Sequence, residues 1–96
     1  MYNVYITKEA VKQCKKQGKA FKIEVSKILV QLGENPILPQ TEKLTGELKY
    51  IYSYHFNYTG TAFRLCYLIN EKEKTLTVIM VGPRENFYKI LKQKLS

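Results

Sequence analysis

The hydrophobic positions of the chain change their period near residue 48. Before that point, apolar side chains recur at helical spacing in two runs that Gly18 separates. The second run shows the pattern best, at i, i+4, i+7, i+8 and i+11: Phe21, Val25, Ile28, Leu29 and Leu32. Thr7 can cap the first run with its side-chain oxygen, and Gly33 ends the second. The spacing predicts two helices joined by a tight turn, which should form an antiparallel hairpin.

From residue 48 onward, apolar and polar residues alternate with a period of two. Three strand-like runs, YIYSYHF, AFRLCYLI and TLTVIMV, are separated by the turn sequences NYTGT and NEKEK. Turns this short favour an antiparallel meander. The opening YNVYI indicates one more strand, and ENPILPQTEK indicates a non-helical connection because of its two prolines. The final RENFYKILKQKL returns to helical spacing.

These elements predict an α+β fold in the order β-α-α-β-β-β-α. An N-terminal strand and a helical hairpin should pack on an antiparallel sheet, followed by a C-terminal helix, with the helices on one face of the sheet. The chain has 96 residues, enough for one modest core, so we expect a single domain over residues 1–96.

Composition narrows the class of protein. Sixteen Lys and Arg residues against eight acidic ones give a formal net charge of +8, which favours a polyanionic or acidic partner, although a basic surface can also serve solubility alone. No apolar run is long enough to span a membrane and no secretory signal is visible, so we expect a cytoplasmic protein that does not contact membranes. Cys14 and Cys66 then read as reduced core residues. No cofactor and no metal site are expected, because the chain has one histidine and no aspartate.

Alternation along the first two meander strands sorts the candidate functional residues. The aromatic residues Tyr50, Tyr52, Tyr54 and Phe56 should face the helices, which leaves Ser53 and His55 on the opposite, open face. Arg64 in the next strand points to the same side as His55, across one hairpin turn. In VGPRENFY, Arg84 and Tyr88 lie one helical turn apart just beyond the third strand.

Together these side chains would form a patch suited to phosphate chemistry on RNA. Guanidinium groups bind phosphate oxygens and stabilise the added negative charge of a pentacovalent transition state. A histidine can accept the proton of a ribose hydroxyl, and a tyrosine can stack on a base. Without a carboxylate cluster for Mg²⁺, the 2′-hydroxyl of RNA would be the natural nucleophile and would leave a 2′,3′-cyclic phosphate.

Each of these residues also has a purely structural interpretation. His55 could be an ordinary surface residue of a strand, and Tyr88 could belong to the core. Arg64 could pair with Glu47 or Glu85 across the sheet, and Arg84 could pair with a nearby carboxylate.

The segments AFRLCY and VGPRENFYKIL resemble the Y-R-[LIV]-x-Y strand and the G-x-R-x-x-x-Y ending of the RelE/ParE superfamily of type II toxin–antitoxin toxins. The resemblance covers nearly the whole chain. It implies a ribosome-dependent, metal-independent endoribonuclease that cleaves mRNA in the ribosomal A site and so inhibits translation. It further implies that Arg64 and Arg84 hold the scissile phosphate and that Tyr88 stacks on the message or assists proton transfer.

Two departures from the pattern and two alternatives remain. RelE has two lysines on the first meander strand, and this chain has Ser53 and His55 at the matching outward positions. We assign the general base to His55, since other members of the superfamily use histidine or glutamate in comparable sites. Lys49 is the alternative general base if the strand register is shifted. Lys49, Ser53 and Lys89 are the expected substrate-binding residues.

The resemblance also implies a cognate, acidic antitoxin. The alternatives are a ParE-like inhibitor of DNA gyrase and a non-catalytic, basic nucleic-acid-binding module.

Overall fold

The computed structural model describes residues 1–96 in full and contains three α-helices, a short 3-10 helix and five strands. In chain order the elements are β1 (Asn3–Ile6), α1 (Lys8–Lys16), α2 (Lys19–Glu34), β2 (Thr41–Lys43), η1 (Gly46–Leu48), β3 (Tyr52–Tyr58), β4 (Thr61–Asn70), β5 (Thr75–Pro83) and α3 (Phe87–Leu95). The predicted α+β class and the order of its main elements are confirmed. No helix is long and apolar enough to cross a membrane.

The strands form one sheet in the order β1-β5-β4-β3-β2. The predicted meander is confirmed, because β3, β4 and β5 pair antiparallel in sequence order. β1 differs from the expected antiparallel sheet, since it pairs with β5 in parallel. The α1–α2 hairpin carries the chain from β1 at one edge of the sheet to β2 at the other, and the meander then returns it to the side of β1. A second edge strand, β2, pairs with β3 inside the segment that was predicted only as a non-helical connection.

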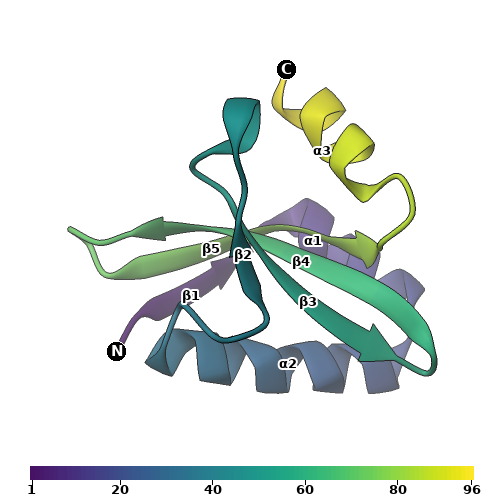
Figure 1. The fold of residues 1–96 in the computed structure, drawn as a ribbon. Helices are drawn as coiled ribbons and strands as arrows, with labels where there is room; N and C mark the ends of the chain where they lie inside the picture. The colour runs from purple at the N-terminus through teal and green to yellow at the C-terminus, as the bar shows by residue number, and fades with distance from the viewer.

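Local signals explain the helical hairpin. The hydroxyl of Thr7 accepts a hydrogen bond from the backbone nitrogen of Ala10 (3.2 Å) and caps α1, as predicted. Gly18 has a φ of 97°, a conformation that L residues with side chains rarely adopt, and it lets the chain turn directly into α2. Figure 1 shows α2 lying below the sheet, with α1 behind it.

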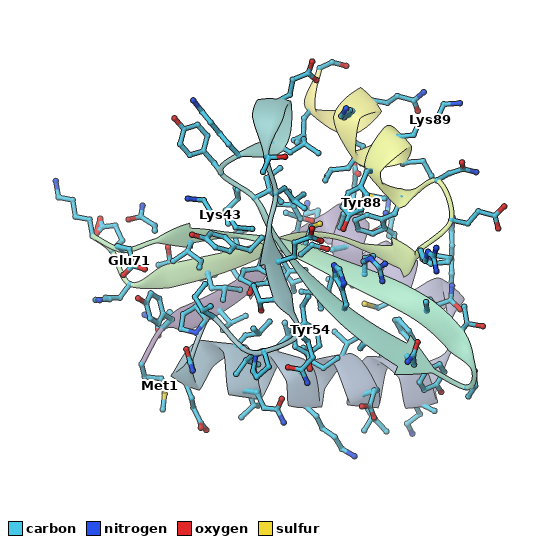
Figure 2. The ribbon with its side chains drawn as sticks, viewed as in Figure 1. Met1, Lys43, Tyr54, Glu71, Tyr88 and Lys89 are labelled. Carbon is cyan, nitrogen blue, oxygen red and sulfur yellow. The ribbon has the colours of Figure 1, made fainter.

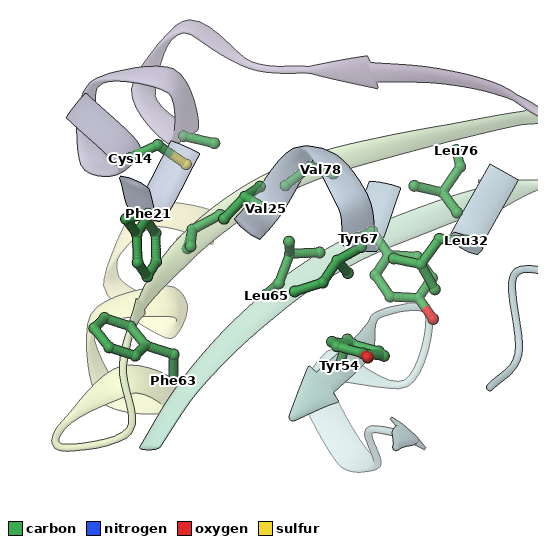
Figure 3. Packing of buried hydrophobic residues seen from close by; sticks show 13 residues of the cluster. Cys14, Phe21, Val25, Leu32, Tyr54, Phe63, Leu65, Tyr67, Leu76 and Val78 are labelled. Carbon is green, nitrogen blue, oxygen red and sulfur yellow. The ribbon is translucent and has the colours of Figure 1, made fainter. Parts of the chain in front are cut away.

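The main core lies between the helical hairpin and the sheet. It contains 13 buried residues, and Phe21 of α2 is at one end of it. The Phe21 ring lies 4.8 Å from the ring of Phe63 and 5.1 Å from that of Tyr58, measured between centroids. Figure 3 shows Phe21 beside Phe63, and Tyr67 beside Leu32 at the other end. The side chains that alternation assigned to the helix side of β3 and β4 therefore do build this core.

The helices do not all lie on one sheet face, and this part of the prediction is wrong. α3 packs on the face opposite to α1 and α2, as Figure 1 shows, and η1 rises on the same side as α3. A smaller cluster of six buried residues fills the space there: Leu48, Ile51, Cys66, Met80, Phe87 and Leu91. β5 contains a bulge beside this cluster. Cys66 pairs with Met80 while Tyr67 pairs with Val78, which leaves Ile79 as an extra residue.

Two further expectations need correction. Tyr50 was assigned to the helix side of β3, but it precedes the strand and is 73% exposed. The C-terminal helix begins at Phe87 rather than at Arg84, because Asn86 adopts a left-handed conformation with a φ of 59° that breaks the helix before that point.

Candidate active site

His55 and Arg64 face each other across the β3–β4 pair, as the sequence predicted. They are direct partners in the register of these strands, and their side chains lie on the α3 side of the sheet. His55 is half-buried, with 35% of its side chain exposed. Its Nε2 atom is shielded from solvent and has no hydrogen bond of normal geometry.

The guanidinium of Arg64 is only partly used by the fold. One terminal nitrogen donates to the carbonyl of Phe63 (3.3 Å), while Nε is buried without a partner. Across the other side of β4, Arg64 pairs with Gly82, so no side chain from β5 covers it at that position. A buried donor left without a partner carries a desolvation cost of roughly 1–3 kcal/mol, and such an atom in a native structure calls for an explanation.

Arg84 follows the last residue of β5 and is exposed. Its backbone nitrogen donates to the carbonyl of Ala62 (2.8 Å), which ties it to β4 two residues from Arg64. The expected helical spacing between Arg84 and Tyr88 is not observed, because Arg84 lies in the turn before α3. The chain has only two arginines, and the sheet brings both to the same end.

Tyr88 lies between α3 and the sheet, as Figure 2 shows, and its hydroxyl donates to Oγ of Ser53 (3.1 Å). Ser53 was predicted on an open face, but it is fully buried because α3 covers this part of the sheet. RNA could reach the Ser53 hydroxyl only if Tyr88 moved. The substrate-binding role predicted for Ser53 therefore depends on that movement.

The two lysines predicted to bind substrate are not brought to this group. Lys49 follows η1, is exposed, and places its ammonium 5.2 Å from the centre of the Tyr50 ring. Lys89 is exposed on α3 and projects from its outer side, as Figure 2 shows. Both remain available to a large polyanion that extends beyond the His55–Arg64 pair.

A carboxylate that the sequence pattern did not indicate completes the arrangement. Oε1 of Glu42 in β2 lies 3.2 Å from Nε2 of His55, within the distance of an ion pair. Glu42 is opposite Ser53 in the β2–β3 register, so its side chain lies on the same face as His55. Its strand is three residues long and follows a proline-containing segment, so no alternation was available to reveal it.

The surroundings of His55 favour its neutral form. Burial lowers the pKa of His55, the positive charge of Arg64 lowers it further, and Glu42 opposes both effects. Because the pKa lies below its ordinary value of 6.5, the imidazole is mostly neutral at pH 7 and can accept a proton. Nearby, burial raises the pKa of the Cys66 thiol to about 12, so Cys66 remains protonated and unreactive.

The ion-pair alternatives for the two arginines are not observed. The salt bridges of the molecule join His55 to Glu42, Lys74 to Glu71 and Lys94 to Glu9, and none includes Arg64 or Arg84. Both guanidiniums therefore keep their charge uncompensated by a carboxylate. No group of three or more His, Cys, Asp or Glu side chains is placed to hold a metal ion. What the site offers is a neutral imidazole beside the guanidinium of Arg64, with Arg84 tied to the same end of the sheet.

The sequence matches a known protein family, and the fold is similar to solved structures. Residues 4–92 match the family described as ParE-like toxin of type II bacterial toxin-antitoxin system. The fold is similar to a chain of the RelBE2 toxin–antitoxin complex from Mycobacterium tuberculosis, with 26% identity, 86% of this chain and 98% of that chain covered, and a TM-score of 0.71. No curated protein matches the chain by sequence.

Two further solved structures share the fold. A chain of the intact Escherichia coli RelBE toxin–antitoxin complex is 24% identical over 88% of this chain and 99% of that chain, with a TM-score of 0.69. A chain of the archaeal RelE–RelB complex from Pyrococcus horikoshii is 25% identical over 88% of this chain and 96% of that chain, with a TM-score of 0.65.

Proposed function

The chain belongs to the ParE-like toxin family of type II bacterial toxin–antitoxin systems, and on this basis we propose that it is an endoribonuclease that cleaves mRNA on the ribosome. One observation carries the proposal. The only histidine lies opposite one of the only two arginines, the other arginine is tied to the same end of the sheet, and neither guanidinium has a carboxylate partner. A purely structural arginine would be expected to find a partner for a buried nitrogen, and Nε of Arg64 has none.

The proposed reaction uses the 2′-hydroxyl of the message as nucleophile. His55 takes the proton of that hydroxyl while the 2′-oxygen forms a bond to phosphorus. The bond from phosphorus to the 5′-oxygen breaks, and the leaving oxygen takes up a proton from water. The products are a 2′,3′-cyclic phosphate and a 5′-hydroxyl. Arg64 and Arg84 would bind the non-bridging phosphate oxygens, whose negative charge grows in the transition state.

Tyr88 would position the nucleotide beside the scissile phosphate. It is half-buried and belongs to the first turn of α3, next to the turn that carries Arg84. Stacking of a base on an aromatic ring requires no particular base, which suits a nuclease that acts on many messages. The hydroxyl, which donates to Ser53 here, would keep the ring in place between α3 and the sheet.

The proposed partners follow from charge and from the relatives. The formal net charge of +8 favours the ribosome and its message, which are polyanions. The similar structures from M. tuberculosis, E. coli and P. horikoshii are toxin–antitoxin complexes, and we propose that this chain likewise binds a cognate antitoxin. An acidic antitoxin segment would complement its basic surface. We expect slow cleavage of free RNA, because the site holds few groups for proton transfer.

A second candidate function is inhibition of DNA gyrase, because the matching family is described as ParE-like. A toxin of that kind would act by binding and would not need a neutral imidazole beside unpaired guanidiniums. It would leave messages intact and inhibit supercoiling by gyrase.

Primer extension on a reporter message in a translating extract tests the proposal. Arg84→Ala removes an exposed side chain and keeps the backbone hydrogen bond to Ala62, so the protein should stay folded. Lys72→Ala is the matched control, because it removes one exposed positive charge from the β4–β5 turn at the other end of the sheet. We expect cuts at ribosome-occupied codons with the wild type and Lys72→Ala, and none with Arg84→Ala. Intact messages with the wild type, together with inhibited gyrase, would establish the second candidate.

A further inference from the structure

The carboxylate of Glu42 and the imidazole of His55 come from different strands and meet on the same face of the sheet. We propose that Glu42 is a positioning residue for His55: it holds Nε2 of the ring, so that Nδ1 is the atom that takes the proton from RNA. The catalytic part of this inference rests on the proposed function. The contact itself, 3.2 Å between Nε2 of His55 and Oε1 of Glu42, does not depend on the proposed function.

The fold fixes the strand that carries Glu42. The backbone nitrogen of His55 donates to the carbonyl of Gln40 (3.1 Å), which sets the register of β2 against β3. On the other face of β2, Oγ1 of Thr41 lies 3.0 Å from the hydroxyl of the buried Tyr67, which also donates to the carbonyl of Pro36. The carboxylate is therefore held by an anchored backbone, even though 59% of its side chain is exposed.

The two nitrogens of the His55 ring have different surroundings. Nε2 is shielded from solvent, faces Glu42 and has no other partner, so it cannot exchange a proton directly with a substrate. The ring is half-exposed, and of its two nitrogens only Nε2 is buried without a partner. Proton transfer to and from RNA therefore falls to Nδ1. A carboxylate beside Nε2 favours the tautomer in which Nε2 carries the hydrogen and Nδ1 carries the lone pair.

Glu42 also balances the charge around the ring. The charged groups that act on His55 are Arg64 from β4, which opposes protonation, and Glu42 from β2, which favours it. α3 contributes the phenol of Tyr88, whose hydrogen is donated to Ser53. When His55 accepts a proton beside the guanidinium of Arg64, the carboxylate of Glu42 would stabilise the imidazolium that forms, as an acidic partner does in other catalytic histidine pairs.

The single histidine makes the test direct, because only one imidazole gives signals in an NMR titration. Glu42→Gln keeps the size of the side chain and removes its charge. Glu47→Gln is the matched control, since it removes an exposed carboxylate from the neighbouring η1. The Glu47 carboxylate forms no ion pair. We expect Glu42→Gln to lower the pKa of His55 and shift its tautomer away from Nε2–H, and Glu47→Gln to change neither. High salt should reduce the difference in His55 pKa between the wild type and Glu42→Gln.

Cleavage on the ribosome gives the second readout. Near neutral pH, Glu42→Gln should cleave at least about 10- to 100-fold more slowly, the range that follows loss of the partner that orients a metal-ligating histidine. The rising limb of its pH profile should move to lower pH, Glu42→Asp should recover part of the rate, and Glu47→Gln should match the wild type.

The outcomes separate the two proposals. An unchanged His55 pKa and pH profile in Glu42→Gln would overturn the positioning role, whatever the wild type does to messages. A wild type that leaves messages intact would overturn the nuclease. In that case, a lowered His55 pKa in Glu42→Gln would still establish the Glu42–His55 coupling.

Discussion

The sheet face under α1 and α2 buries 13 residues in one cluster, whereas the face under α3 buries six. The polar groups of the two faces differ even more. On the first face, the hydroxyl of Tyr67 has two partners, Thr41 and the carbonyl of Pro36. The only buried side-chain nitrogen or oxygen atoms without a hydrogen bond, on His55 and Arg64, both lie on the second face.

This difference separates what holds the fold together from what could do chemistry. Burial of apolar area stabilises the first face, and no buried polar side-chain atom on it lacks a hydrogen-bond partner. The second face keeps positive charge and a half-buried imidazole close to one end, at some expense in stability. Substitutions on the two faces should therefore separate loss of folding from loss of cleavage.

The largest effect on stability is expected from Phe21→Ala. The Phe21 side chain is fully buried and contacts three aromatic rings, so its removal should cost about 3–5 kcal/mol of unfolding free energy. Urea denaturation followed by circular dichroism measures this loss. Ile23→Ala, which truncates a side chain that is 52% exposed on the same helix, should change little. A loss below about 1 kcal/mol for Phe21→Ala would mean that this face is not the main source of stability.

Leu91→Ala should have a smaller and more local effect. Leu91 is buried in the six-residue cluster that joins α3 to the sheet, and its truncation should cost about 2–3 kcal/mol. Hydrogen exchange should show α3 losing protection while β4 and β5 keep theirs. Leu95→Ala is the control, because Leu95 is 54% exposed. Equal loss of protection throughout the sheet would show that the two faces do not unfold separately.

Tyr88→Phe should cost about 1 kcal/mol, because it deletes the hydrogen bond to the buried Ser53. Tyr50→Phe is the control, since the Tyr50 side chain is exposed. Combining Tyr88→Phe with Ser53→Ala in a double-mutant cycle measures the coupling between the two hydroxyls. Strictly additive losses would contradict the hydrogen bond. Cleavage should survive in Tyr88→Phe if the ring acts by stacking.

The smallest expected effect is a dependence of stability on pH that comes from His55. Its pKa is lower in the folded protein than the ordinary 6.5, so the unfolded chain binds the proton more readily. Stability should therefore be complete above about pH 6.5 and fall as the pH drops from there to the folded pKa. Arg64→Gln should raise the folded pKa and flatten this dependence. Thermal unfolding across that range, compared with His55→Gln, isolates the contribution, and identical profiles would contradict it.

Periodicity predicted the larger face well and the smaller face poorly. Alternation correctly placed Phe63, Leu65 and Tyr67 under the helices and Arg64 on the other side, because strands of seven to ten residues repeat the pattern several times. The same pattern could not show that α3 crosses to the other face. An apolar stripe states that a helix is buried on one side and does not state against what.

Within the site, each residue that the sequence could not place has its own structural reason. The His55–Arg64 pair could be predicted because a hairpin fixes the register of two neighbouring strands. The position of Arg84 outside the helix depends on the left-handed Asn86, and the helical period gave no sign of it. Glu42 was missed because its strand of three residues forms only through pairing with β3. Tertiary pairing, rather than local propensity, places that carboxylate.

The most direct test of the proposed chemistry uses a message with a 2′-O-methyl group at the nucleotide where the ribosome-bound message is cut. The wild type should cleave the unmodified message, leave a 2′,3′-cyclic phosphate at its new end, and leave the modified message intact. Cleavage of the modified message at the same position would contradict attack by the 2′-hydroxyl. If neither message is cut, the site formed by His55, Arg64 and Arg84 is not that of a nuclease.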